Sequence, residues 1–112
     1  MIEAIYRAVG IAELTDIYRT EHFRFGPNGS EMKQFWLSEA DAHDFLDIMN
    51  TLLGMKEYSA IVMALVEQST LVAGSPGTDP LNGVLRPYIT YDRSLLALVN
   101  ADVSRYGIQQ VK

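Results

Sequence analysis

Along the first half of the chain, segments with a two-residue hydrophobic period alternate with segments that have a helical period. Ile2–Val9 alternates imperfectly and contains β-branched and aromatic residues, which predicts a first strand. From Ile11 to about Arg19, apolar residues recur every three or four positions, as on one face of an amphipathic helix. A second strand is expected at Lys33–Leu37, followed by a helix from Glu39 to about Leu53. The first half is therefore predicted to be strand, helix, strand, helix.

The middle of the chain is predicted to contain two strands, one before and one after a surface loop. Tyr58–Gln68 has apolar residues at both parities, which favours a strand covered on both faces at the centre of the sheet, although a buried helix shows the same pattern. Gly74–Pro80 is rich in glycine and proline and is interpreted as a loop. Val84–Tyr91 is predicted to be a strand that Pro87 either places at an edge or shortens.

The end of the chain adds one helix and one strand. Asp92 is a suitable N-cap for a helix whose apolar face begins at Leu95 and Leu96. After Gly107 interrupts the helical pattern, Tyr106–Val111 is predicted to form a short closing strand. Residues 1–112 are thus expected to form a single α+β domain of order βαβαββαβ, with a mostly antiparallel sheet of about five strands and three helices.

Composition supports an ordered domain and excludes several kinds of chemistry. The 112 residues are 48% hydrophobic and 21% charged, which is typical of a globular chain. The sequence has no cysteine, so disulfides, thiolate metal sites and a thiol nucleophile are excluded, and a cytoplasmic protein is predicted. No basic segment followed by an apolar run opens the sequence, so export by a signal peptide is not expected, and no apolar run reaches the roughly 20 residues that span a bilayer.

The charge pattern and the two histidines exclude further classes of function. The formal charge of -5 and the scattered basic residues argue against a broad nucleic-acid-binding surface. They do not exclude a nucleic-acid site in a local basic cleft. His22 and His43 form no metal-binding pair, so no metal site is predicted. No nucleophile-elbow pattern surrounds any serine, which leaves a combination such as Ser38, His43 and Asp92 without support as a catalytic triad.

Two local patterns have a structural interpretation. Ser38, Glu39, Ala40 and Asp41 have the form of a helix-capping box. Phe23 and Phe25 flank the Gly26–Ser30 turn segment and are expected to anchor it to the core rather than to await a ligand.

A set of short motifs in the first fifty residues resembles a known family. Tyr6-Arg7 lies on the first strand, Phe23–Ser30 reads Phe-Arg-Phe-Gly-Pro-Asn-Gly-Ser, Lys33–Ser38 reads Lys-Gln-Phe-Trp-Leu-Ser, and Glu39–Ala42 opens a helix. In this order they resemble small ADP-ribosyltransferase-like domains that occur as toxin tips and in mobile elements. The resemblance implies that the domain binds NAD and modifies a macromolecular target.

The resemblance also implies roles for individual residues. Arg7, with Tyr6 beside it, would hold the pyrophosphate or ribose of NAD, because a guanidinium is a planar bidentate donor. Ser38 would bind the nicotinamide ribose, and Phe35 or Trp36 would stack on the nicotinamide ring. Asn28 would belong to a lid over the cofactor.

The chain departs from the family at the catalytic acid. The wider family places a glutamate on a late strand, often two residues after Gln or Glu, and this chain has no such motif. Glu67 and Asp92 are the nearest substitutes for that acid. Two of these binding residues also have a purely structural interpretation: Arg7 as a salt-bridge partner on an edge strand, and Ser38 as the helix cap.

A second function class stays open from the sequence alone. The small size, the acidic surface and the missing late glutamate favour a non-enzymatic module that binds another protein, for example an inhibitor of phage or mobile-element type. The acceptor, the partner and the oligomeric state have no signature in the sequence.

Overall fold

A computed structural model describes residues 1–25, 32–51 and 58–112 and confirms the predicted α+β class. The elements, in chain order, are β1 (Ile2–Val9), α1 (Ile11–Thr20), β2 (Met32–Trp36), α2 (Glu39–Thr51), β3 (Ala60–Glu67), α3 (Gln68–Ala73), β4 (Ser75–Leu81), β5 (Val84–Asp92), α4 (Leu96–Tyr106) and β6 (Ile108–Gln110). The predicted turn at 26–30 and the predicted end of the second helix at Leu53 and Gly54 lie outside the described residues.

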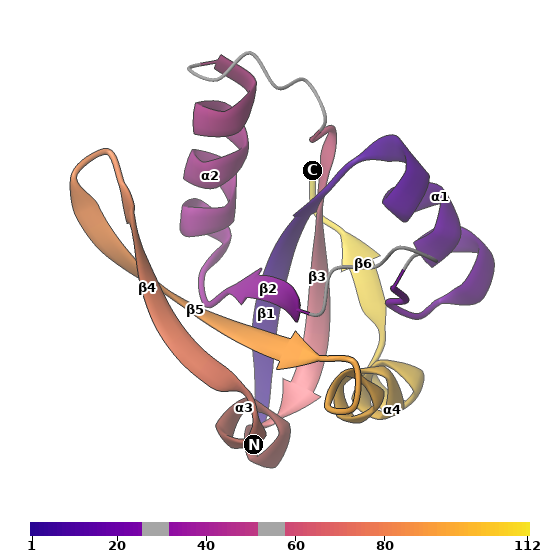
Figure 1. The fold of residues 1–112 in the computed structure, drawn as a ribbon. Helices are drawn as coiled ribbons and strands as arrows, with labels where there is room; N and C mark the ends of the chain where they lie inside the picture. Colours follow the sequence, from indigo (N-terminus) through magenta and orange to yellow (C-terminus); the bar gives the residue numbers. More distant parts are fainter. Residues whose placement is uncertain (26–31, 52–57) are drawn as a thin grey trace.

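The strands form one sheet in the order β4-β5-β2-β1-β3-β6, and every neighbouring pair is antiparallel. Figure 1 shows β4 and β5 running steeply across the direction of β1 and β3. β1 pairs with β3 along its whole length, whereas it pairs with β2 only at Tyr6 opposite Trp36. A single residue pair therefore joins the β4-β5-β2 side of the sheet to the β1-β3-β6 side.

Helices cover the two faces of the sheet unequally, and each face has its own core. The α1 face carries α1, α3 and α4, whose side chains pack on strand residues such as Ile5, Val62 and Tyr91. The α2 face carries α2, which packs on Ala8, Trp36 and Ile61 (Figure 1). Because successive strand residues point to opposite faces, the alternation in β1 and β3 supplies both cores. The strand predicted at Tyr58–Gln68 is present as β3, but it lies beside the edge strand β6 and not at the centre of the sheet. Its α1 face is buried throughout, whereas on the α2 face Met63 and Leu65 are only half-buried.

Local signals in the sequence explain the start of α2 and the turn that precedes α4. The Ser38 hydroxyl accepts a hydrogen bond of 3.1 Å from the backbone N–H of Asp41, so the predicted cap of α2 is confirmed. The Asp92 carboxylate accepts the backbone N–H of Leu95 at 2.8 Å and organises the turn before α4. Phe23 is buried in the core of the α1 face, and Phe25 packs against that core, which confirms that these rings anchor the chain after α1.

The interpretation of Gly74–Pro80 as a loop was wrong, because Ser75–Leu81 forms the strand β4, which pairs with residues 84–90 of β5. Asn82 and Gly83 both have positive φ, of 54° and 78°, and connect the two strands as a two-residue hairpin turn. Gly77 is needed in this strand, since a Cβ there would lie 2.5 Å from Cζ of Tyr88. The aromatic ring on β5 occupies the space that a side chain on β4 would fill.

Three further details correct the sequence interpretation. Pro87 is neither the end of a strand nor on an outermost strand. It lies one residue beyond the Trp36–Tyr88 pair that ends the β2 ladder, where β5 has a partner only in β4 and its missing N–H has no pairing to lose. Residues 68–73 form the short helix α3, which was not predicted. Tyr106 ends α4 rather than starting the last strand.

Glu21 is in the left-handed conformation, with φ of 60°, where its N–H closes α1 on the carbonyl of Ile17 at 2.7 Å. Glycine adopts this conformation without the steric cost that a side chain meets, and it is the common residue at this helix position. Glu21→Gly is therefore expected to stabilise the fold by about 0.5–1 kcal/mol and to raise Tm by a few degrees. Thermal unfolding followed by circular dichroism checks this, with Glu21→Ala as the control that should show no gain.

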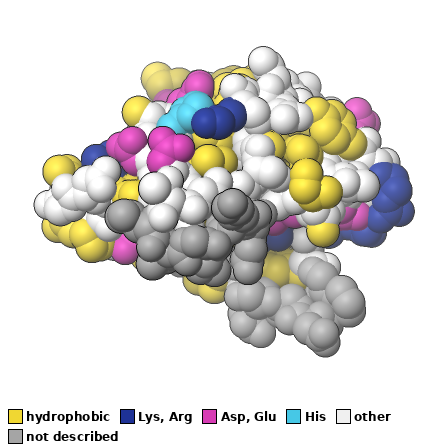
Figure 2. All heavy atoms as spheres, turned by 90° about the horizontal axis from the view of Figure 1, so that it is seen from above, with side chains coloured by type: hydrophobic (Ala, Val, Ile, Leu, Met, Phe, Trp, Pro, Cys, Tyr) yellow, Lys and Arg dark blue, Asp and Glu magenta, His cyan; other side chains and the backbone are white. Residues whose placement is uncertain are grey.

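Surface charge on the described part of the chain is mixed. In the view from above, basic side chains occur in small groups beside acidic ones, with hydrophobic side chains between them (Figure 2). The described helices include none that is long and apolar enough to cross a membrane.

Candidate functional site

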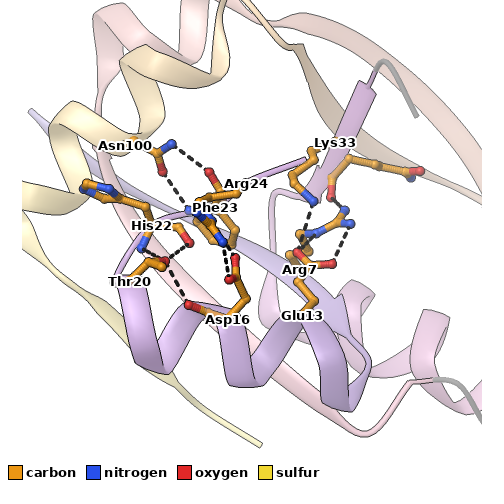
Figure 3. Close-up of polar contacts among 10 residues, drawn as sticks. Arg7, Glu13, Asp16, Thr20, His22, Phe23, Arg24, Lys33 and Asn100 are labelled. Carbon is orange, nitrogen blue, oxygen red and sulfur yellow. Dashed lines mark hydrogen bonds and ion pairs between the residues drawn. The ribbon is translucent and has the colours of Figure 1, made fainter. Parts of the chain in front are cut away.

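Two cations and one carboxylate meet on the α1 face where β1 and β2 separate. Arg7 comes from β1, Lys33 from β2 and Glu13 from the first turns of α1 (Figure 3). Arg7 grips the Glu13 carboxylate with two hydrogen bonds, Nε to Oε2 at 2.7 Å and Nη2 to Oε1 at 3.1 Å. Lys33 Nζ lies 3.4 Å from the same Oε2. Arg7 Nη1 also donates to the Gln34 carbonyl at 3.0 Å, which ties β1 to β2 beyond their single residue pair.

An aromatic ring and a third cation extend this group. Lys33 Nζ is 5.2 Å from the centre of the Phe25 ring, and Arg93 Cζ is 4.9 Å from the same centre. Such distances allow the ring to attract both cations through its negative faces. We call Arg7, Glu13, Phe25, Lys33 and Arg93 the Arg7–Lys33 cluster.

Burial and charge act in opposite directions on the two titratable groups at the centre of the cluster. Burial raises the pKa of Glu13, but the hydrogen bonds and positive charges of Arg7 and Lys33 outweigh it and hold that pKa below its ordinary value. Burial lowers the pKa of Lys33, and the Arg7 charge lowers it further, against the opposing effects of Glu13 and Asp16. The carboxylate is therefore charged at neutral pH, while the ammonium of Lys33 is only partly stabilised.

The cluster has more positive than negative charge, which suits an anion. Arg7 and Lys33 share one carboxylate, and Arg93 adds a third cation at the Phe25 ring. A guanidinium has five N–H donors, and Arg7 uses three of them within the described part of the chain. Two N–H groups, one on each terminal nitrogen, remain for a ligand. Arg7 is 20% exposed, so such a ligand can reach it.

Arg7 and Ser38, which the resemblance assigns to one cofactor cleft, do not meet in the structure. The Arg7 side chain turns toward α1, whereas Ser38 caps α2, which covers the opposite face of the sheet. Ser38 thus has the structural role of a helix cap, and Arg7 that of a salt-bridge partner, although on the interior strand β1 and not on an edge strand. The pyrophosphate role of Arg7 fits the residual charge of the cluster, but no described contact of Ser38 leads to that cluster.

The aromatic residues expected near nicotinamide are divided between the two cores. Phe35 is fully buried on the α1 face, packed edge-on against Phe23 and Tyr91 with ring centres 5.0 and 5.9 Å away. Trp36 is 2% exposed on the α2 face, where the half-buried Tyr6 packs against the same core. Stacking on a ligand needs an open ring face, and neither Phe35 nor Trp36 has one.

The two carboxylates considered for catalysis lie apart from each other. Glu67 ends β3, five residues from the Val62 that pairs with Arg7, or about 16 Å along the strand. Its side chain accepts a hydrogen bond of 3.0 Å from the Tyr106 hydroxyl. Asp92 ends β5 opposite Met32 and next to Arg93, so it is the nearer of the two to the cluster. Asn28, the proposed lid residue, lies outside the described residues.

A hollow of about 620 Å³ lies elsewhere, between the C-terminal ends of α1 and α4. His22 Nε2 is 2.8 Å from the Ser104 hydroxyl on its wall, but both side chains are exposed to water. None of the residues predicted for the site lines this hollow. We therefore place the candidate site at the Arg7–Lys33 cluster, where the charges are partly buried and converge.

Sequence reasoning found Arg7 but missed its partners. Glu13 and Lys33 were interpreted only as parts of a helix and a strand, Phe25 only as an anchor, and Arg93 was not singled out. One signal could have identified Lys33. It has the parity of Phe35, so its side chain points into the core, and lysine is almost never buried without a partner.

No protein-family model matches the chain, and neither a curated protein nor a solved structure matches it.

Proposed function

We propose that this domain binds NAD through the pyrophosphate, at the Arg7–Lys33 cluster. The observation that supports the proposal is that Arg7 and Lys33, both partly buried, share a single carboxylate among the residues that the structure describes. A diphosphate supplies the missing negative charge and matches the geometry of the remaining Arg7 donors. Phe25 adds an apolar side chain beside Lys33 and Arg93, which lowers the exposure of these two cations to water.

The activity that the sequence resemblance implies is ADP-ribosyl transfer to a macromolecular target. Of the two candidate acids, Asp92 fits this proposal better than Glu67, because it directly precedes Arg93 and pairs with the strand that carries Lys33. The Asp92 carboxylate also holds Ser94 and the start of α4. A change there would affect the fold as well as transfer, so binding is the property to test first.

NAD is expected to stabilise the native protein, by about 2.7 kcal/mol at a hundredfold excess over Kd. Arg7→Ala is expected to abolish this stabilisation, because it removes the two N–H groups that face the ligand. Thermal shift with and without NAD, followed by calorimetric titration, measures both effects.

Arg86→Ala is the matched control. Arg86 is 18% exposed, close to the exposure of Arg7, and it also bonds carboxylates, those of Asp41 and Asp44 on α2. The Arg86 variant should lose stability yet keep its response to NAD. A native protein that ignores millimolar NAD, or an Arg7 variant that responds normally, contradicts the proposal.

A second candidate function, binding of another protein, is favoured by the outer surface of β1 and β3. Ile2 is exposed there, and Met63 and Leu65 are only half-buried on the same face as Ile61, beyond the part that α2 covers. Leu65→Lys should disturb such an interface and leave the NAD response unchanged. Loss of the NAD response in this variant would argue against two separate surfaces.

A further inference from the structure

Lys33 is an unusual lysine in the described structure. Its side chain is 8% exposed, and its amine lies between the Glu13 carboxylate, the Phe25 ring and the neighbouring Arg7. An amine that is desolvated and placed beside another cation is more readily present in its neutral form, which is the nucleophile. Lys33 is thus a candidate nucleophile, and it lies in a cluster that has more positive than negative charge.

We propose that Lys33 forms an imine with phosphorylated aldehydes held in the Arg7–Lys33 cluster. The inference rests on the proposed function in one respect, namely that the cluster binds a phosphate group. Arg7 and Arg93 would hold the phosphate, since Arg93 lies over the same Phe25 ring as Lys33, and Arg7 bonds the same Glu13 carboxylate as Lys33. The ligand class includes the open-chain form of phosphorylated sugars, which combines an aldehyde with a phosphate.

The reaction balances without an oxidant or a reductant. The neutral Lys33 nitrogen attacks the carbonyl carbon, and the carbonyl oxygen takes a proton to give a carbinolamine. Loss of the hydroxyl as water then leaves a C=N bond. Glu13 Oε2, 3.4 Å from Nζ, is placed to accept the proton that the nitrogen loses and to return it to the departing oxygen.

Charged groups on α1 and β1 change the pKa of the Lys33 amine. Glu13 and Asp16 on α1 favour the charged form, whereas burial and Arg7 on β1 disfavour it more strongly, so the pKa of Lys33 lies below that of a free lysine. At neutral pH a larger fraction of Lys33 is therefore unprotonated. This difference should make Lys33 react faster with aldehydes than Lys112.

Labelling with pyridoxal 5′-phosphate tests the proposal directly, because the reagent joins an aldehyde to a phosphate. The native protein is treated with it near pH 7, reduced with borohydride to fix the imine, digested and mapped by mass spectrometry. The chain has three lysines, Lys33, Lys56 and Lys112, which makes the map simple. We expect Lys33 to be labelled at least tenfold faster than Lys112, and pyridoxal without the phosphate to label it far more slowly.

Competition and variants make each outcome decisive. Inorganic pyrophosphate should protect Lys33, and Lys33→Arg, which keeps the charge, should lose this label, whereas Lys112→Arg should keep it. Equal labelling of Lys33 and Lys112, or equal rates with pyridoxal and its phosphate, overturns the proposal. If pyrophosphate protects Lys33 and NAD does not, the imine proposal stands and NAD binding fails, so the two failures can be told apart.

Discussion

Asp102→Ala is expected to lower the free energy of unfolding by about 3 kcal/mol. Asp102 is 6% exposed on α4, and its Oδ2 accepts the backbone N–H of Glu67 at 3.0 Å and the hydroxyl of Thr70. Alanine would leave both donors buried without a partner, and each such group costs about 1–3 kcal/mol. This carboxylate therefore fastens α4 to the junction between β3 and α3.

The same network extends to β5, in the β4-β5-β2 half of the sheet. The Tyr91 hydroxyl on β5 donates to the Thr70 carbonyl at 2.9 Å. Burial, with a smaller effect from the Asp102 charge, raises the pKa of Tyr91 to about 12, so the phenol stays protonated and keeps this bond at neutral pH. Loss of Asp102 thus loosens Thr70 and the link from α3 to β5.

Urea unfolding followed by circular dichroism measures the Asp102 effect, and Asp102→Asn is the control. Asparagine has the same shape and keeps one acceptor oxygen, so it should lose clearly less stability than alanine. If the two variants were equally stable, the carboxylate could not be the group that satisfies these donors.

Trp36→Ala is expected to have the largest effect on stability, about 3–5 kcal/mol. Trp36 is 2% exposed in the core of the α2 face, with ring centres of Phe45 and Tyr88 at 5.4 and 5.8 Å. It joins residues from α2, β2 and β5, and it also forms the backbone pair with Tyr6 that connects β1 to β2. A cavity at this position would separate α2 from the sheet and weaken the joint between the strands.

Guanidinium-induced unfolding measured by far-UV circular dichroism suits this variant, since it lacks the only tryptophan of the chain. Trp36→Phe fills part of the space and should lose much less stability. An alanine variant within about 1 kcal/mol of the native protein would show that the α2 core collapses around the gap, contrary to close packing.

Alternation and capping in the sequence were sufficient to predict most of the elements. β1 and α1 were placed within a residue or two, and the Ser38 cap set the start of α2 correctly. β4 was missed because its glycine and prolines are poor strand formers alone, and only packing with Tyr88 on β5 makes Gly77 favourable. The Asn82-Gly83 pair was the local signal for this hairpin.

The candidate site was harder to predict because it depends on which face each side chain reaches. The family resemblance assigned Arg7 and Ser38 to one cofactor site, but the structure directs Arg7 to α1 and leaves Ser38 with α2. The association of Lys33 with Glu13 joins residues twenty positions apart and follows from the docking of α1 on the sheet. Such a contact has no local signature in one sequence.

The single residue pair between β1 and β2 links the candidate site to the mechanics of the domain. Next to that pair, the Arg7 side chain donates a hydrogen bond to the Gln34 carbonyl and so joins β1 to β2 where their backbones do not pair. The same guanidinium bonds Glu13 on α1, so a single side chain fixes the helix and both halves of the sheet relative to one another.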